Sequence, residues 1–223
     1  MVIKAALFDL HGTLAYVKNP VNDWTVSDFL VSHGYEVYPQ TFNTAWRVVA
    51  FIDYPKYGYK NYRQFLQRVL WRLKVKVDSA TLDGLVRLYE SGKFELYPDA
   101  PKALATAKEN HLKTAVVTTI ARFKFEAPLL PIIKFIDIVM DGYKAGCEKT
   151  NPKMYRKTLE ILKVAPFEAV MIGDDLEIDV MLPKKLGIHA ILLDREGKIR
   201  HTTLADAVVR DLNEAVETIL KRF

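Results

Sequence analysis

Short apolar segments that end in polar residues, with amphipathic segments between them, are the feature that most constrains this fold. Five such apolar segments are residues 2–8, 112–118, 136–140, 168–173 and 189–194. The intervening segments carry apolar residues at helical spacing, as in residues 152–162. This alternation predicts the α/β class, with a parallel sheet between two layers of helices in a Rossmann-like core.

Polar side chains directly after the predicted strands are the first candidates for function. In an open parallel sheet, ligands bind beyond the carboxyl ends of the strands, where these side chains gather. They are Asp9, Thr118, Thr119, Asp141, Asp174 and Asp175. We therefore expect a functional site at this edge of the sheet.

A helical module interrupts the α/β pattern. Residues 59–73 place six apolar or aromatic side chains on one helical face: Tyr62, Phe65, Leu66, Val69, Leu70 and Leu73. The region around this segment shows helical periodicity throughout. We predict an α/β core domain made of residues 1–15 and 94–223, and a small helical domain made of residues 16–93.

Composition and charge exclude several classes of protein. The net charge is +5 over 223 residues, but Lys and Arg are scattered, which does not predict nucleic-acid binding. No apolar run reaches the roughly 18–20 residues that span a bilayer, and no signal peptide is recognisable, so we expect a cytoplasmic protein away from membranes. The single cysteine, Cys147, permits no internal disulfide and no cysteine-based metal cluster. Nothing indicates an oligomeric state.

Four motifs in order along the chain resemble those of the haloacid dehalogenase superfamily, most of whose members are phosphatases. They are "FDLHGTL" at 8–14, "AVVTT" at 115–119, "EKTNPKMY" at 148–155 and "IGDDLEIDVMLPKKLGI" at 172–188. The helical module between the first two motifs is similar to the small helical cap of that family. The resemblance therefore spans nearly the whole chain.

The resemblance implies a role for several residues. Asp9 takes the position of the nucleophile, Thr118 that of the residue that hydrogen-bonds a phosphoryl oxygen, and Lys149 that of the cation that neutralises charge on the transferring group. Thr13 takes the position of a residue that supports the loop and, with Thr119, completes the expected substrate-binding residues. The reaction would pass through an aspartyl-phosphate intermediate that water then hydrolyses.

The acidic residues predict a metal site. A phosphate monoester carries about two negative charges, so a carboxylate that attacks phosphorus needs a cation between the two groups. Mg²⁺ favours hard oxygen ligands, and Asp9 and Asp174 are the expected carboxylate ligands. By resemblance, the backbone carbonyl of His11 is a further ligand. Asp179 is a supporting or weaker ligand, whereas Asp175 either joins this group or caps the following helix.

His11 departs from the pattern of the phosphatases, which carry an aspartate at this position to protonate the leaving alcohol and to activate water. A histidine is a competent acid and base near neutral pH, so we expect His11 to take this role, although it could also only fill space. The 2-haloacid dehalogenases carry an aromatic residue there, and Arg47 could imitate the arginine that their cap uses for halide. The dehalogenases have neutral residues where this chain has Asp174 and Asp175.

We therefore predict an enzyme, an Mg²⁺-dependent phosphatase. A small helical lid excludes bulky substrates, so a small phosphorylated metabolite is the expected substrate. Two alternatives stay open. One is a 2-haloacid dehalogenase that uses Asp9 without a metal. The other, motivated by the missing aspartate at His11, is a non-catalytic phosphate-binding or regulatory module.

Overall fold

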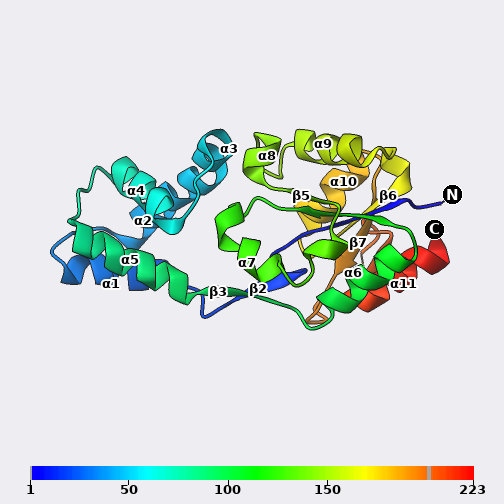
Figure 1. Cartoon of the computed structure of the whole chain (residues 1–223), viewed down its shortest axis with the longest axis horizontal. Coiled ribbons are helices and arrows are strands. Elements are labelled where there is room, and N and C mark those ends of the chain that lie inside the picture. The colour runs from blue at the N-terminus through cyan, green and yellow to red at the C-terminus, as the bar shows by residue number, and fades with distance from the viewer. Residues whose placement is uncertain (1, 200–201) are drawn as a thin grey trace.

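The computed structural model describes residues 2–199 and 202–223. It contains a parallel six-stranded sheet in the order β5-β4-β1-β6-β7-β8, which lies on the right-hand side of Figure 1. The strands are β1 (Ala5–Phe8), β4 (Lys113–Val117), β5 (Ile138–Met140), β6 (Ala169–Gly173), β7 (His189–Leu193) and β8 (Ala207–Val209). β1 lies between β4 and β6 and pairs with both. The residues that follow β1 therefore lie at the middle of the carboxyl edge of the sheet.

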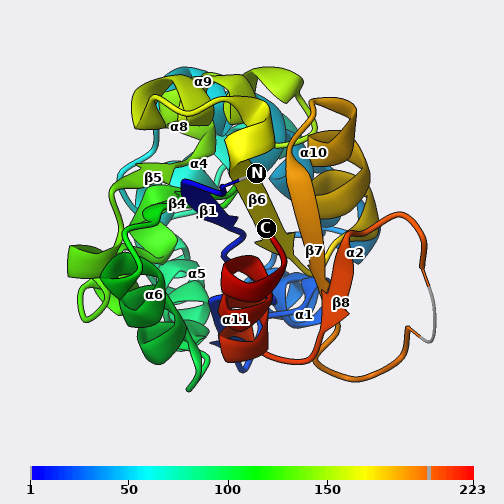
Figure 2. The ribbon, with the colours of Figure 1, turned by 90° about the vertical axis from the view of Figure 1, so that its right-hand side faces the viewer.

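Alternation of side chains along the strands creates two apolar layers. Ala6 and Phe8 pack on one face with helices α6 (Ala100–Glu109) and α11 (Leu212–Arg222). Ala5 and Leu7 pack on the other face with α9 (Pro152–Leu162). Figure 2 shows α6 and α11 below the sheet, with α9 and α10 (Leu182–Lys185) above it. This arrangement confirms the predicted three-layer α/β fold, because period-two alternation buries both faces of each strand.

The remaining helices of the α/β part are short. They are α7 (Glu126–Leu129), α8 (Gly142–Ala145), the 3₁₀ turns Arg122–Lys124, Ile133–Phe135 and Pro166–Glu168, and the π-helical turn Leu176–Met181. Within the described residues, no helix is both long and apolar enough to cross a membrane.

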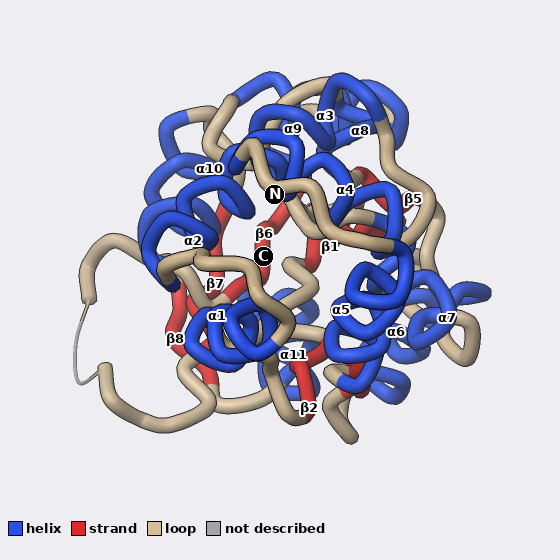
Figure 3. Tube along the Cα trace, turned by 90° about the vertical axis from the view of Figure 1, so that its left-hand side faces the viewer, coloured by secondary structure: helices blue, strands red, loops and turns tan. Residues whose placement is uncertain are grey.

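Helices between β2 and β3 form a second region with its own apolar core, which faces the viewer in Figure 3. They are α1 (Asp23–Ser32), α2 (Pro39–Val48), α3 (Tyr54–Tyr57), α4 (Tyr62–Leu73), α5 (Ser79–Ser91) and the π-helical turn Val49–Asp53. The buried side chains at its centre include Leu30, Phe42, Phe65, Leu66 and Leu85. Amphipathic helices bury one apolar face each, which is the pattern that the sequence shows in residues 59–73. The domain limits at residues 15–16 and 93–94 stay a prediction.

An antiparallel ribbon of β2 (Ala15–Lys18) and β3 (Lys93–Leu96) joins the helical module to the α/β part (Figure 1). These two strands and β8 were not predicted from the sequence. Each strand has only three or four residues, and some of its side chains are exposed or half-buried. None of the three therefore forms a long enough apolar run to be recognised. A second link lies at α3, where Tyr54 Oη donates a hydrogen bond to Asp141 Oδ1 (3.3 Å) and accepts one from the backbone N–H of Arg122 (2.9 Å).

Candidate active site

Asp9 follows β1 directly and is buried at the carboxyl edge of the sheet. Its backbone N–H donates to the carbonyl of Ile172 on β6 (2.9 Å), which continues the parallel pairing by one residue and fixes where the side chain begins. The loop then turns at Gly12, whose φ is +81°. A Cβ at Gly12 would also collide with the carboxylate of Asp174, so both the backbone conformation and the close approach require glycine there.

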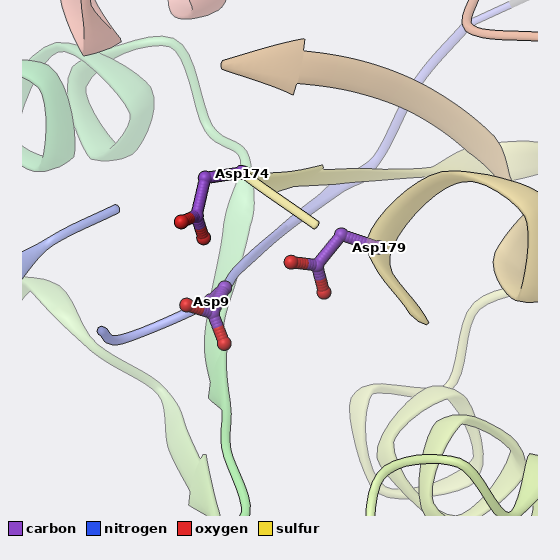
Figure 4. A group of neighbouring side chains, drawn as sticks. All are labelled: Asp9, Asp174 and Asp179. Carbon is purple, nitrogen blue, oxygen red and sulfur yellow. The ribbon is translucent and has the colours of Figure 1, made fainter. Parts of the chain in front are cut away.

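Three carboxylates meet at this edge: Asp9, Asp174 and Asp179 (Figure 4). One oxygen from each lies within 4.8 Å of the others. Asp174 follows β6 and is exposed, whereas Asp179 is buried in the π-helical turn Leu176–Met181. A π-helical turn is rare and often occurs at a functional site, and here it carries a carboxylate of the cluster.

Asp175 has a different place from its neighbours. Its Oδ1 accepts hydrogen bonds from the backbone N–H groups of Glu177 (2.8 Å) and Ile178 (3.0 Å). This is the N-cap of the π-helical turn, one of the two positions that the sequence left open for Asp175. The cap anchors the turn that carries Asp179.

Lys149 lies buried between two of the carboxylates, with 1% of its side chain exposed. Its Nζ forms ion pairs with Asp9 and, at 2.6 Å, with Asp179 Oδ1. Although burial opposes the charged form, the two carboxylates hold the pKa of Lys149 well above its usual value. The Lys149 side chain is therefore a permanent ammonium beside the candidate nucleophile.

The single positive charge of Lys149 does not neutralise the three carboxylates of the cluster when all three are ionised. Burial, together with the neighbouring charge of Asp174, raises the pKa of Asp9, and burial with the charge of Asp179 raises the pKa of Asp174. Burial and the charge of Asp9 raise the pKa of Asp179 to about 7. Burial is the largest cause of each shift, and repulsion between the carboxylates adds to it. The cluster is built only of hard oxygen donors, and it could hold a divalent cation that removes the repulsion.

The threonines of the predicted site lie close to this cluster. Thr118 is buried after β4, and its Oγ1 accepts a hydrogen bond from the backbone N–H of Ile120 (3.1 Å). Thr118 and Thr119 line the same cavity as Asp9 and Lys149. Thr13 is buried and does not line this cavity, and its Oγ1 donates to Asp174 Oδ1 at 3.4 Å. Thr118 and Thr119 are therefore placed to meet a ligand, whereas Thr13 meets a carboxylate.

His11 lies two residues beyond Asp9 with an exposed side chain. It lines the cavity that contains Asp9, and its ring meets Phe94 edge-on with the centroids 6.1 Å apart. An exposed imidazole at the rim of the cavity is accessible to a bound molecule. The role of its backbone carbonyl as a metal ligand stays a prediction.

Arg195 is a positioning residue that the sequence analysis missed. Its guanidinium donates to the carbonyl oxygens of Gly12 (3.3 Å) and Thr13 (2.7 Å), forms an ion pair with Asp99 (2.9 Å) and stacks on the ring of Tyr97 (3.8 Å). These contacts hold the loop that follows the candidate nucleophile. The four partners come from two separate parts of the chain, both far in sequence from Arg195, so no local motif could have indicated them.

Two residues named in the sequence analysis lie outside the carboxylate cluster. Asp141 caps α8 by accepting from the backbone N–H groups of Tyr143 (2.9 Å) and Lys144 (3.0 Å), and it pairs with Arg122 (2.9 Å). Arg47 is exposed on α2, with its guanidinium 5.6 Å from the ring centroid of Phe51. The residues that line the cavity at Asp9 do not include either one.

Known proteins are similar to this chain in sequence and in fold. Over an alignment of 229 residues, it is 27% identical to the glyceraldehyde 3-phosphate phosphatase of Pyrococcus furiosus, with 97% of this chain and 93% of that protein covered. A phosphatase structure from Thermococcus onnurineus matches with a TM-score of 0.67 and 24% identity, covering 98% of each chain. A 2-haloacid dehalogenase structure from Pseudomonas syringae matches with a TM-score of 0.73 and 19% identity, covering 99% of each chain.

At these identities the structural matches establish the fold alone, since the dehalogenase overlays at least as well as the phosphatase. The family is established separately. The model of the haloacid dehalogenase-like hydrolases matches residues 3–187, which include Asp9, Lys149 and the three-carboxylate cluster. The chain therefore belongs to the haloacid dehalogenase-like hydrolase family.

Proposed function

We propose that this protein is an Mg²⁺-dependent phosphatase that acts on a small phosphorylated metabolite through an aspartyl-phosphate intermediate. The observation that carries the proposal is the cluster of Asp9, Asp174 and Asp179 around the single ammonium of Lys149. A reaction at a neutral carbon needs no divalent cation, whereas transfer of a phosphoryl dianion to a carboxylate does, and a cluster of carboxylates could hold that cation.

The first step transfers the phosphoryl group to Asp9. A carboxylate oxygen of Asp9 attacks phosphorus, a new P–O bond forms, and the bond from phosphorus to the leaving oxygen breaks. Lys149 stabilises charge on the transferring group, and Thr118 donates a hydrogen bond to a phosphoryl oxygen. Protonated His11 gives its proton to the leaving oxygen, so the alcohol leaves neutral.

The second step regenerates the enzyme. Neutral His11 takes a proton from a water molecule, whose oxygen attacks phosphorus as the bond from phosphorus to Asp9 breaks. Inorganic phosphate leaves, and His11 ends the cycle protonated as it began. Arg195 keeps the loop from Gly12 to Thr13 in place through both steps, because it holds two of the carbonyl groups of that loop.

Asp9, Asp174 and Asp179, with the carbonyl of His11, are the groups we propose to hold Mg²⁺. When bound, the ion screens the repulsion between Asp9 and the phosphoryl group and acts as a Lewis acid. The raised pKa values of the three carboxyls support this assignment, since repulsion from a neighbouring carboxylate adds to the effect of burial at each one.

The helical module supports a small substrate. We propose that residues 16–93 act as a cap domain on a core of residues 1–15 and 94–223. The cap shields the reaction from bulk water and leaves no room for a bulky phosphoprotein. The relative in Pyrococcus furiosus, a glyceraldehyde 3-phosphate phosphatase, supports the same size of substrate.

Three assays test the proposal with p-nitrophenyl phosphate as substrate: with Mg²⁺, with EDTA, and with the Asp9→Asn variant. We expect turnover only with Mg²⁺ and a loss of at least about a thousandfold in Asp9→Asn, because the amide is no nucleophile. Asp211→Asn is the matched control, since Asp211 caps the remote helix α11 and asparagine caps equally well. Metal-independent release of chloride from 2-chloropropionate would establish the dehalogenase alternative instead. No turnover of either substrate would favour a binding module.

A further inference from the structure

A second cavity, of about 240 Å³, lies next to the carboxylate cluster, between the α/β part and the helical module. Its walls are largely aromatic or aliphatic and include Val17, Trp46, Tyr62, Tyr89, Phe94 and Ile120. His11 and Ile120 line both this cavity and the one that contains Asp9. A molecule with its phosphoryl group at Asp9 would therefore extend its leaving group past His11 into this second cavity.

Lys124 brings an ammonium into this apolar cavity. Its Nζ lies 4.3 Å from the ring centroid of Trp46, 4.6 Å from that of Phe65 and 5.6 Å from that of Tyr62. Lys124 is half-buried, and burial lowers the pKa of its ammonium to about 7, an effect that no carboxylate offsets among the described residues. The rings give some cation–π stabilisation but supply no counter-charge.

An ammonium held this way costs folding free energy, because a charge removed from water needs a partner of opposite charge. A bound carboxylate would supply that partner through a charge-assisted hydrogen bond. Among the described residues that line the cavity, Lys124 alone carries an ammonium or guanidinium group. One such cation matches the single charge of a carboxylate better than the two charges of a second phosphate.

The shape and lining of the cavity define the rest of the ligand. Apolar cavities of about 150 Å³ already hold benzene, so this one has room for a ring or a short aliphatic chain with a substituent. Aromatic walls favour an apolar body over a polyhydroxylated one, because buried sugar hydroxyls would each need a hydrogen-bond partner.

We propose that this cavity is the leaving-group pocket and that Lys124 selects phosphate monoesters whose leaving group carries a carboxylate on an apolar body. This inference rests on the proposed phosphatase function and narrows its substrate class. Lys124 is a specificity-determining residue in this account, and the bond-breaking steps at Asp9 do not involve it.

Three esters with matched leaving oxygens test the proposal: benzyl phosphate, 4-carboxybenzyl phosphate and its neutral isostere 4-carbamoylbenzyl phosphate. In the wild type, we expect a KM for the carboxylate about tenfold below that for the amide, as one charge-assisted hydrogen bond provides. In Lys124→Met this ratio should fall to about one, and Lys124→Arg should retain part of it. Lys134→Met is the matched control, since Lys134 is exposed and lies against Phe135 outside the cavity.

Binding without turnover separates this inference from the proposed function. Benzoate and benzamide are titrated into the metal-free protein, with tryptophan fluorescence as the signal, since Trp46 is the one of the three tryptophans that lines the cavity. We expect benzoate to bind about tenfold more tightly than benzamide in the wild type, and equally in Lys124→Met. This difference should persist even if no ester is hydrolysed, in which case the phosphatase proposal alone would fail.

Several results would overturn the inference. One is a wild-type enzyme that does not distinguish the carboxylate from the amide, either in KM or in binding. Another is an equal preference in Lys124→Met and the wild type, which would leave Lys124 as a packing residue. A third is a lower KM for the 4-phosphonobenzyl ester than for the carboxylate, which would assign the cavity to a dianion. Circular dichroism of each variant verifies that it is folded.

Discussion

Two lysines in this protein differ in their neighbours: one lies between carboxylates and the other among aromatic rings. Lys149 sits between Asp9 and Asp179, and its pKa is held above the usual value. Lys124 sits among aromatic rings, and its pKa is lowered to about 7. Burial lowers the pKa of both lysines, so the difference comes mainly from the carboxylates beside Lys149. An ammonium paired with carboxylates stays charged and can stabilise the transferring group. An ammonium without such a partner is suited to bind an anionic ligand.

The same substitution at the two lysines is the sharpest test of this contrast. Lys149→Met should lower kcat at least a hundredfold, since a cation at the transferring group is lost. It should also lower the free energy of unfolding by about 3 kcal/mol, because two buried carboxylates lose their counter-charge. Enzyme assays and urea denaturation measure the two effects. Lys153→Met, at an exposed lysine of α9, is the control. An unchanged kcat would contradict the assignment.

His11 lines both cavities, and its replacement tests whether proton transfer to the leaving group occurs between them. His11→Ala should slow hydrolysis of benzyl phosphate about a hundredfold, because an alkoxide leaves poorly without a proton. Hydrolysis of p-nitrophenyl phosphate should slow far less, since nitrophenolate leaves without one. Steady-state rates on the two esters give the comparison. Equal losses on both would leave His11 as a packing residue.

Substitution of Arg195 tests whether the activity of Asp9 depends on the hydrogen bonds that hold the loop after it. Arg195→Met removes the hydrogen bonds to the carbonyls of Gly12 and Thr13, so the loop after Asp9 is held less firmly. We expect a loss of about tenfold in kcat with little change in KM, because misplacement of a reacting group slows the chemical step. The exposed Arg87 on α5 provides the control substitution, Arg87→Met. A change confined to KM would contradict this role.

Lys124→Met should have the smallest effect, and one opposite in sign to Lys149→Met: higher thermal stability at pH 7. The pKa of Lys124 is about 7 in the folded protein and close to 10.5 in the unfolded chain. Between these values the unfolded chain binds more protons, so wild-type stability gains from rising pH. The advantage of the variant should therefore be greatest below pH 7 and shrink toward pH 10.

Melting temperatures of both proteins from pH 6.5 to 9.5 measure this trend. The other titratable groups that line the cavity are His11, Tyr62 and Tyr89, and Glu90 lines an adjoining pocket with Lys124. They are present in both proteins, and burial raises the pKa of Tyr62 to about 12, beyond the tested range. A difference in melting temperature that does not vary with pH would contradict the account.

The sequence predicted the α/β fold and the residues of the carboxylate cluster because both depend on local patterns. A buried parallel strand is a short apolar run, and the residue after it lies at the edge of the sheet. Asp9, Thr118 and Asp174 each follow such a run directly. The strands β2, β3 and β8 were missed because they are short and partly exposed, so no apolar run marks them.

The contacts of Arg195 and the cavity around Lys124 could not be predicted from local sequence patterns. Arg195 meets Gly12, Thr13 and Asp99 across 96 to 183 positions of sequence. Trp46 and Phe65 reach Lys124 from two helices of the module. A single arginine or lysine has no distinctive neighbours in the sequence, and only the packing of distant segments gives it a partner.

The sequence by itself therefore determined the fold and the identity of the acidic residues. A short apolar run and the polar residue that follows it are both visible within a few positions of sequence. The tertiary structure alone decided which charges are compensated. Lys149 and Lys124 are the same residue type, 25 positions apart. Their pKa values shift in opposite directions because folding brings carboxylates to one and aromatic rings to the other.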